Sequence, residues 1–198
     1  MMSQPVAQPV SSTSANEYHK YYNLGSFHRP VSTHSLEAQS WFNAGLTWSY
    51  AFNHEEAVCC FEHAISHDPT CAIAYWGLAY ALGPNYNKPW QSFDESDLGS
   101  TVERTHNAMV KAQETAKHAL PVEQALLRAL GFRYPRATAD STDDFPIWND
   151  EYAREMGLVF EEFPDDLDVA TLFADALMNL KPWGLFDMKT GQPAPGAR

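Results

Sequence analysis

The chain has 198 residues, of which 44% are hydrophobic and 19% charged, and its 13 basic and 25 acidic side chains give a formal net charge of −12 at pH 7. This length is enough for one domain or a small repeat array, and the composition is that of a packed protein. The negative charge would repel phosphate backbones and anionic membrane surfaces, so we expect neither nucleic acid nor a membrane as partner.

Residues 1–17 are rich in Ser, Gln, Pro and Thr, and we expect them to form a flexible leader. They show neither the basic region nor the apolar run of a secretory signal, so none is expected there. Residues 18–183 carry helical patterning, whereas 184–198 contain too much Gly and Pro for a continuous helix. The sequence therefore predicts a leader, one helical domain and an irregular tail.

Two cap signals define the first predicted helices. Ser35 is placed to cap a helix that runs to about residue 52. Asn53, with Glu56 three residues later, is a variant of the capping box and opens a second helix that Pro69 ends.

Gly and Pro residues delimit the later elements. A third helix ends at Gly83, and further helices are expected over 94–118, from Pro121, from Pro146 and after Pro164. Asp165 and Asp166 then lie at a helix N-terminus, where negative charge is favourable, so we interpret them as structural. No run alternates like a strand, and the predicted class is all-α with about seven helices.

A 34-residue period organises the first two of these helices. Counting from Ala38, the large and small residues fall at seven of the eight signature positions of the tetratricopeptide repeat: Trp41, Gly45, Trp48, Ala57, Phe61, Ala64 and Pro69. Degenerate units follow, because Pro164 aligns with Pro69 and two later segments each run into a Pro-Trp pair. The sequence resembles a tetratricopeptide repeat protein, and small residues at these positions would let paired helices approach closely.

The segments YAFNHEEA, DPTCAIAYWGLAYALGPNYNKPW and FPDDLDVATLFADALMNLKPW resemble a bacterial and fungal family of tetratricopeptide-containing proteins, mostly without assigned function. The resemblance implies an array of antiparallel helix pairs that serves as a scaffold, and no known reaction. Members usually continue through further repeats, which implies that this chain corresponds to an N-terminal portion or to a shortened relative.

Cys59, His63 and His67 are four residues apart and share one stripe of a helix, the spacing that a metal site or a thiol–imidazole pair requires. In the repeat register the stripe avoids the packing positions, so we favour a polar helix face over metal binding. Acidic neighbours would also work against a cysteine nucleophile. With Cys60 and Cys71 the cysteines number three, and we expect reduced thiols in a cytoplasmic setting.

The loop GPNYNKPW carries the most interesting candidates. Its binding candidates are Asn85, Tyr86, Asn87, Lys88 and Trp90. Long loops in compact domains are often functional, but we favour a structural role in which Tyr86 and Trp90 cap the first repeat pair and the asparagines satisfy the turn backbone. We hypothesise that the loop lines one pocket together with Asn53 and His54, at the turn between the first two helices. Tyr75 and Tyr80 are further candidates for ligand contact.

Three functions remain open at this point. The first is a protein-interaction scaffold whose helical groove binds a neutral or basic, aromatic-compatible segment of a partner. The second is an enzyme or accessory protein of a small-molecule pathway that uses the polar pocket near His54. The third is self-association through uncapped apolar ends. No motif calls for a cofactor, a metal or a catalytic residue.

Overall fold

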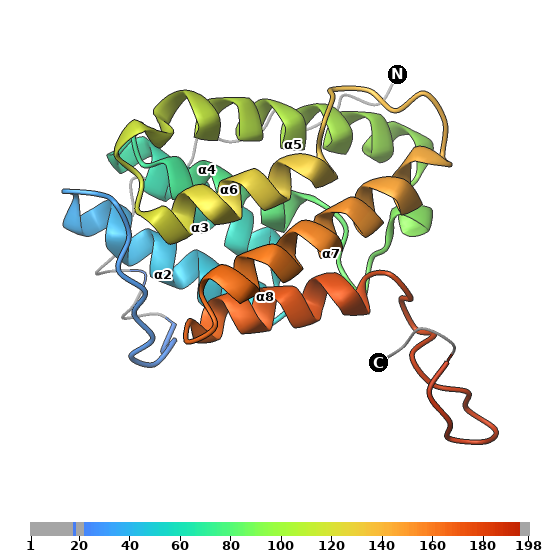
Figure 1. Ribbon diagram of the computed structural model, residues 1–198. Coiled ribbons are helices and arrows are strands. Elements are labelled where there is room, and N and C mark those ends of the chain that lie inside the picture. The colour runs from blue at the N-terminus through green and yellow to red at the C-terminus, as the bar shows by residue number, and fades with distance from the viewer. Residues whose placement is uncertain (1–17, 19–21, 195–198) are drawn as a thin grey trace.

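The computed structural model describes residue 18 and residues 22–194, and this part of the chain is all-α. It contains seven α-helices and no strand (Figure 1). The α-helices are α2 (Leu36–Tyr50), α3 (His54–His67), α4 (Ala72–Leu82), α5 (Glu95–Thr115), α6 (Pro121–Arg133), α7 (Asp144–Glu162) and α8 (Leu167–Met178). Short 3-10 turns at Trp90–Ser92 and Ala116–His118 flank α5. The predicted class and number of helices are confirmed.

Helices that follow one another in the chain mostly pack against one another. Helix α2 packs on α3, α3 on α4, α4 on α5, α6 on α7, and α7 on α8. Figure 1 shows α6, α7 and α8 as a staggered layer in front of α2 to α4, with α5 along one edge. Each helix therefore buries its apolar stripe against its sequence neighbours, as short connections favour.

The predicted caps of the first two helices are confirmed. The Ser35 hydroxyl accepts a hydrogen bond from the backbone N–H of Ala38 at 3.1 Å, and the Asn53 side chain accepts one from Glu56 N at 3.3 Å. Each side chain thus accepts a hydrogen bond from a backbone N–H group of the first turn, which has no acceptor within the helix.

The start of α7 differs from the prediction, because the helix begins at Asp144 rather than at Pro146. The Asp144 carboxylate accepts hydrogen bonds from the backbone N–H groups of Asp140 at 2.7 Å and Ser141 at 3.3 Å. Proline is tolerated in this first turn because its missing N–H would have no helical partner there.

The ring of Phe61 fills the contact between three helices. It lies on α3 and is fully buried between Gly45 of α2 and Gly77 of α4. A Cβ on Gly45 would come within 2.8 Å of the ring, and one on Gly77 would come closer still. Gly45 and Phe61 thus pack as the small and large residues of the repeat pattern suggested, while Gly77 lies outside that pattern.

Helix α8 is hydrogen bonded to residues from distant parts of the chain. The Tyr50 hydroxyl at the end of α2 donates to Asp168 Oδ1 at 2.7 Å, and the Tyr80 hydroxyl of α4 donates to Asp175 Oδ2 at 3.0 Å. Arg29, just before α2, is also held by Asp166 and Asp168. The last helix therefore lies against the side of the array that α2 and α4 present.

The predicted leader lies outside the described residues. The described part of the predicted tail, 184–194, forms turns and a single antiparallel bridge between Phe186 and Pro193. No helix in the described ranges combines the length and the apolar character needed to cross a bilayer.

Candidate functional site

An open hollow of about 490 Å³ lies where the start of α3 meets the α4–α5 loop and the first half of α5. We call it the loop hollow. Its lining residues are Phe52, Asn53, His54, Glu55, Val58, Ala81, Leu82, Gly83, Asn85, Asn87, Lys88, Phe93, Asp97, Ser100, Thr101 and Arg104.

Five of the residues singled out from the sequence line this hollow. Asn53 and His54 come from the α2–α3 turn, and Asn85, Asn87 and Lys88 come from the loop after α4. The two segments are about thirty residues apart in the chain, and the packing of α3 on α4 brings them together. Their role in binding stays a prediction.

The four aromatic candidates do not line the hollow. Tyr80 is buried and stacks on Trp76 with ring centroids 5.3 Å apart. Trp90 is only 3% exposed and stacks on Phe145 at 4.4 Å, so it is a core residue. The ring of Tyr86 packs against Trp183, the residue just before the tail. These three aromatic rings therefore pack against other rings of the fold.

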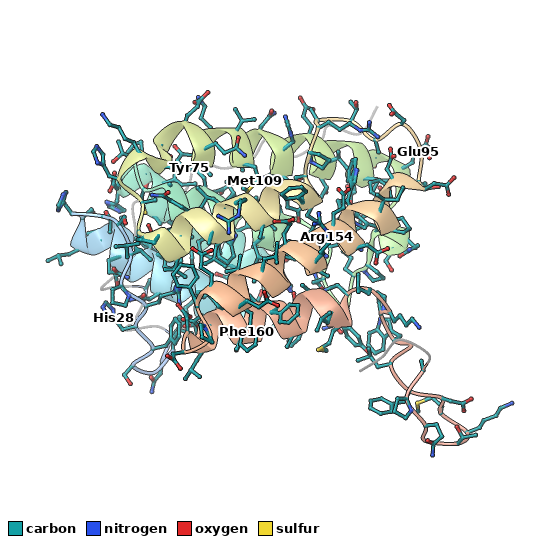
Figure 2. The ribbon with its side chains drawn as sticks, viewed as in Figure 1. His28, Tyr75, Glu95, Met109, Arg154 and Phe160 are labelled. Carbon is teal, nitrogen blue, oxygen red and sulfur yellow. The ribbon has the colours of Figure 1, made fainter. Side chains whose placement is uncertain are left out.

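Tyr75 is also distant from the hollow. Its hydroxyl donates to the backbone oxygen of Pro69 at 3.2 Å, at the start of α4. Figure 2 shows Tyr75 well separated from Glu95, the residue that begins α5 next to the loop.

Asn85 stabilises the loop itself. Its side-chain oxygen accepts hydrogen bonds from the backbone N–H groups of Asn87 at 2.9 Å and Lys88 at 3.0 Å, and the residue is buried. Asn87 and Lys88 are exposed. Of the two loop asparagines, therefore, Asn85 is explained as a turn residue and Asn87 is the one free to contact a ligand.

Phe52 forms part of the rim and was not predicted. Its backbone has φ of 58°, and its N–H donates to Ser49 O at 3.1 Å while Asn53 N–H donates to Trp48 O at 2.9 Å. This pair of bonds is the Schellman ending of a helix, in which glycine usually occupies the position of Phe52. The ring is 50% exposed. A bulky side chain is thus held in a left-handed conformation without the benefit of full burial.

His54 forms the inner part of the hollow. Both ring nitrogens are buried and have no hydrogen-bond partner in the described part of the chain. Burial lowers the pKa of His54, Arg133 acts in the same direction, and Asp175 opposes them. The imidazole is therefore neutral at pH 7, with one nitrogen able to donate and the other able to accept a hydrogen bond.

The charges around the hollow are mixed. Lys88 Nζ lies 4.1 Å from the centroid of the Phe93 ring, a cation–π contact that positions the ammonium group. Arg104 pairs loosely with Glu62, which lies outside the hollow, at 3.4 Å. Glu55 and Asp97 supply two carboxylates. Two acids and two bases give the hollow no strong preference for a charged ligand.

The cysteine and histidine stripe does not form a comparable site. Cys59 and His67 are exposed, while the His63 ring stacks on Trp41 at 4.3 Å. Among the described residues no group of three or more His, Cys, Asp or Glu side chains is placed to hold a metal ion.

The three thiols have raised pKa values. Burial is the largest cause for each, and it raises the pKa of Cys60 and of Cys71 to about 12. Neighbouring glutamates also contribute for Cys59. These environments disfavour the thiolate that a nucleophile requires.

The sequence analysis missed eleven of the sixteen lining residues, among them Phe52, Phe93, Thr101 and Arg104. A local signal existed only for Phe52. A helix that ends just before an N-cap Asn, without glycine at its last turn, places a bulky residue in the left-handed position. The other three lie near or on α5, whose position depends on the length and path of the loop.

No family model, curated protein or solved structure matches the chain.

Proposed function

We propose that this chain is a protein-interaction module that binds a short segment of a partner protein in the loop hollow. The observation that carries the proposal is the exposed Phe52 ring, held at the rim in a strained backbone conformation beside the amide of Asn53 and the imidazole of His54. Residues held in such conformations cluster at binding sites, because the surrounding structure must stabilise them.

The chemistry of the hollow suits a peptide. Phe52, Val58 and Phe93 offer apolar surface, while the Asn87 amide and the Asn53 amide nitrogen, whose partner oxygen caps α3, match groups of an extended backbone. Its opening to solvent suits part of a longer chain better than an enclosed small molecule.

The inner face of the array is a less suitable groove. Tyr50 and Tyr80 point from α2 and α4 to carboxylates of α8. A partner helix on that face would have to displace α8 and break these hydrogen bonds. We therefore place partner binding at the loop hollow rather than at the inner groove that the repeat resemblance implies.

The test is affinity capture with quantitative mass spectrometry on the whole chain. A triple variant, Phe52→Gly with Asn87→Ala and Lys88→Ala, removes the exposed contacts and leaves the turn residue Asn85 intact. We expect it to lose one or more partners that the wild type retains. A segment of such a partner, made as a peptide, should then bind the wild type by calorimetry and bind the variant at least about tenfold more weakly.

The matched control is Leu158→Ala on α7, which removes an apolar side chain that is 47% exposed and lies outside the hollow. It should retain every partner. If the triple variant and the wild type retain the same partners, the loop hollow is not the binding site.

A second candidate function uses the same hollow as the small-molecule pocket of an enzyme or accessory protein. The observation that favours it is the buried, neutral His54 with no partner for either ring nitrogen. His54→Gln would then abolish retention of a metabolite detected by mass spectrometry of the purified chain, while partner capture would be unaffected.

A further inference from the structure

Arg133, the last residue of α6, has an unusual environment for a charged side chain. It is 0% exposed, and no carboxylate among the described residues lies within 4.0 Å of it. Its Nε donates to Asn149 Oδ1 at 3.0 Å, and the guanidinium carbon lies 5.1 Å from the centroid of the Tyr152 ring. These two contacts fix the plane of the guanidinium group.

The other donors of Arg133 are unused. Nη1 and Nη2 are buried and have no hydrogen-bond partner in the part of the chain that the structure describes. An arginine carries five N–H groups, so the four on Nη1 and Nη2 lack an acceptor in good geometry, although the Tyr134 hydroxyl lies close enough for a weak interaction with the guanidinium group. Leaving a buried charge in this state is strongly unfavourable, and an acceptor at Nη1 and Nη2 would remove the penalty.

Two tyrosine hydroxyls near Arg133 are also buried polar groups. Tyr134 and Tyr152 are 2% and 1% exposed, and neither hydroxyl makes a hydrogen bond of good geometry within the described ranges, although Arg133 lies near enough to the Tyr134 hydroxyl to lower its pKa. Burial raises the pKa of Tyr134 to about 12, with Arg133 opposing and Asp175 reinforcing the rise. Burial raises the pKa of Tyr152 as well. Both phenols are therefore neutral, and each lies close enough to Arg133 for its charge to oppose the rise in pKa.

The charges of Arg133 and Asp175 together favour binding of a singly charged anion that has two oxygens. The planar fork of arginine matches a carboxylate, which accepts two parallel hydrogen bonds. Asp175 is close enough to affect the pKa of Tyr134, Tyr152 and His54, so it would oppose a doubly charged phosphate. A monocarboxylate can therefore use all three donor groups with less repulsion.

We propose that Arg133, together with the hydroxyls of Tyr134 and Tyr152, forms an internal binding site for a small carboxylate. The site lies where the end of α6 packs on α7, the neighbouring helix in Figure 1. It involves none of the lining residues of the loop hollow, and so goes beyond the proposed partner binding.

The loop hollow lies next to the Tyr134 hydroxyl. Gly83 lines that hollow, and the Tyr134 hydroxyl lies against Gly83 so closely that a Cβ there would overlap it. A rotation of the Tyr134 side chain would thus connect the hollow to Arg133.

The experiment uses the full chain and sodium acetate as the probe, with acetamide, sodium phosphate and sodium chloride at matched ionic strength. Acetate should raise the melting temperature in a saturable way and shift the ¹⁵N resonances of the Arg133 guanidinium. Acetamide and chloride should do neither. Tyr134→Phe and Tyr152→Phe keep the rings and should each weaken acetate binding about tenfold, the loss expected for one hydrogen bond to a charged group.

Arg133→Met removes the charge while keeping most of the side-chain volume, and should abolish the effect of acetate. Asn87→Ala, in the loop hollow, should leave it unchanged. If acetate has no effect on the wild type, the unpaired donors contact water only and the proposal is wrong. Equal acetate binding by the wild type and both phenylalanine variants would also overturn it, whether or not Arg133→Met folds. Stabilisation by phosphate but not by acetate would overturn the assignment to carboxylates.

Discussion

Arg29 binds both carboxylate oxygens of Asp166, a residue 137 positions later in the chain, through Nη1–Oδ1 and Nη2–Oδ2 hydrogen bonds of 2.9 Å each. Its Nη1 also donates to Asp168 Oδ2 at 2.7 Å. Both carboxylates lie at the start of α8, so this cluster fastens the last helix to the segment that precedes α2.

Replacing Arg29 should therefore destabilise the fold. Arg29→Met should lower the free energy of unfolding by roughly 2–4 kcal/mol, because it leaves two partly buried carboxylates without their cation. Urea denaturation followed by circular dichroism measures this. Arg128→Met is the control, since its pair with Glu162 at 3.2 Å is about half exposed and contributes less than about 1 kcal/mol. Equal losses in the two variants would show that the Arg29 cluster adds nothing beyond a surface ion pair.

The same cluster predicts a pH dependence. Burial by itself raises the pKa of Asp166, but hydrogen bonds from Arg29 and from the backbone of Val169 outweigh it and hold the pKa below the ordinary value. The stabilisation is therefore complete above the unfolded-state pKa of about 4, and it is lost as the pH falls through the lower folded-state pKa.

Asp166→Asn should flatten the acid side of the stability profile measured by thermal melting between about pH 2 and 6. Part of the slope should remain, because hydrogen bonds also lower the pKa of Asp68 and Asp144. An unchanged profile would indicate that Asp166 does not titrate differently in the folded and unfolded states.

Gly77 should tolerate no side chain. Gly77→Ala would drive a methyl group into the buried ring of Phe61 and should reduce stability by about 2 kcal/mol or more. Gly99→Ala on α5 is the matched control, because a Cβ there meets nothing within 4 Å and alanine favours helix, so a gain of about 0.5–1 kcal/mol is expected. Chemical denaturation of both variants decides the question. A stable Gly77→Ala variant would mean that Phe61 has room to move.

The protein should be at least as stable with glycine at position 52 as with phenylalanine. Phe52→Gly relieves a left-handed backbone at the end of α2 and loses a half-exposed ring, so the melting temperature should rise or stay unchanged. Phe52→Ala keeps the backbone strain and loses the ring, so it should be less stable than the glycine variant by about 1 kcal/mol. A large loss of stability in Phe52→Gly would instead assign the ring to packing and remove the main support for partner binding at the hollow.

Much of the fold follows from signals within a few residues of each helix end. Ser35 and Asn53 cap helices because their side chains reach a backbone donor three residues later, and that geometry is set locally. The exception is α7, which starts at Asp144, two residues before Pro146. The Asp144 carboxylate accepts N–H groups from the preceding connector and caps none of its own helix. A proline therefore shows where a helix is permitted to begin without fixing its first residue.

Local sequence signals of this kind predicted only part of the candidate site. His54 and Asn87 could be grouped because His54 begins α3 and Asn87 follows the end of α4, and these two consecutive helices pack side by side. Trp90 carried the same loop signal, yet its ring is buried on Phe145 of α7, a helix more than fifty residues further along. Nothing in the loop sequence shows which helix will cover it.

The sequence by itself determined the helical class, the first two caps and the packing of Phe61 on Gly45, because these depend on backbone donors and side-chain volumes within one or two helices. Only the tertiary structure decided that Arg29 meets Asp166, that Arg133 is fully enclosed and that α8 lies against α2 and α4. These contacts join residues from distant helices, so they depend on how small rotations between successive helices add up along the array, and no local pattern encodes that sum.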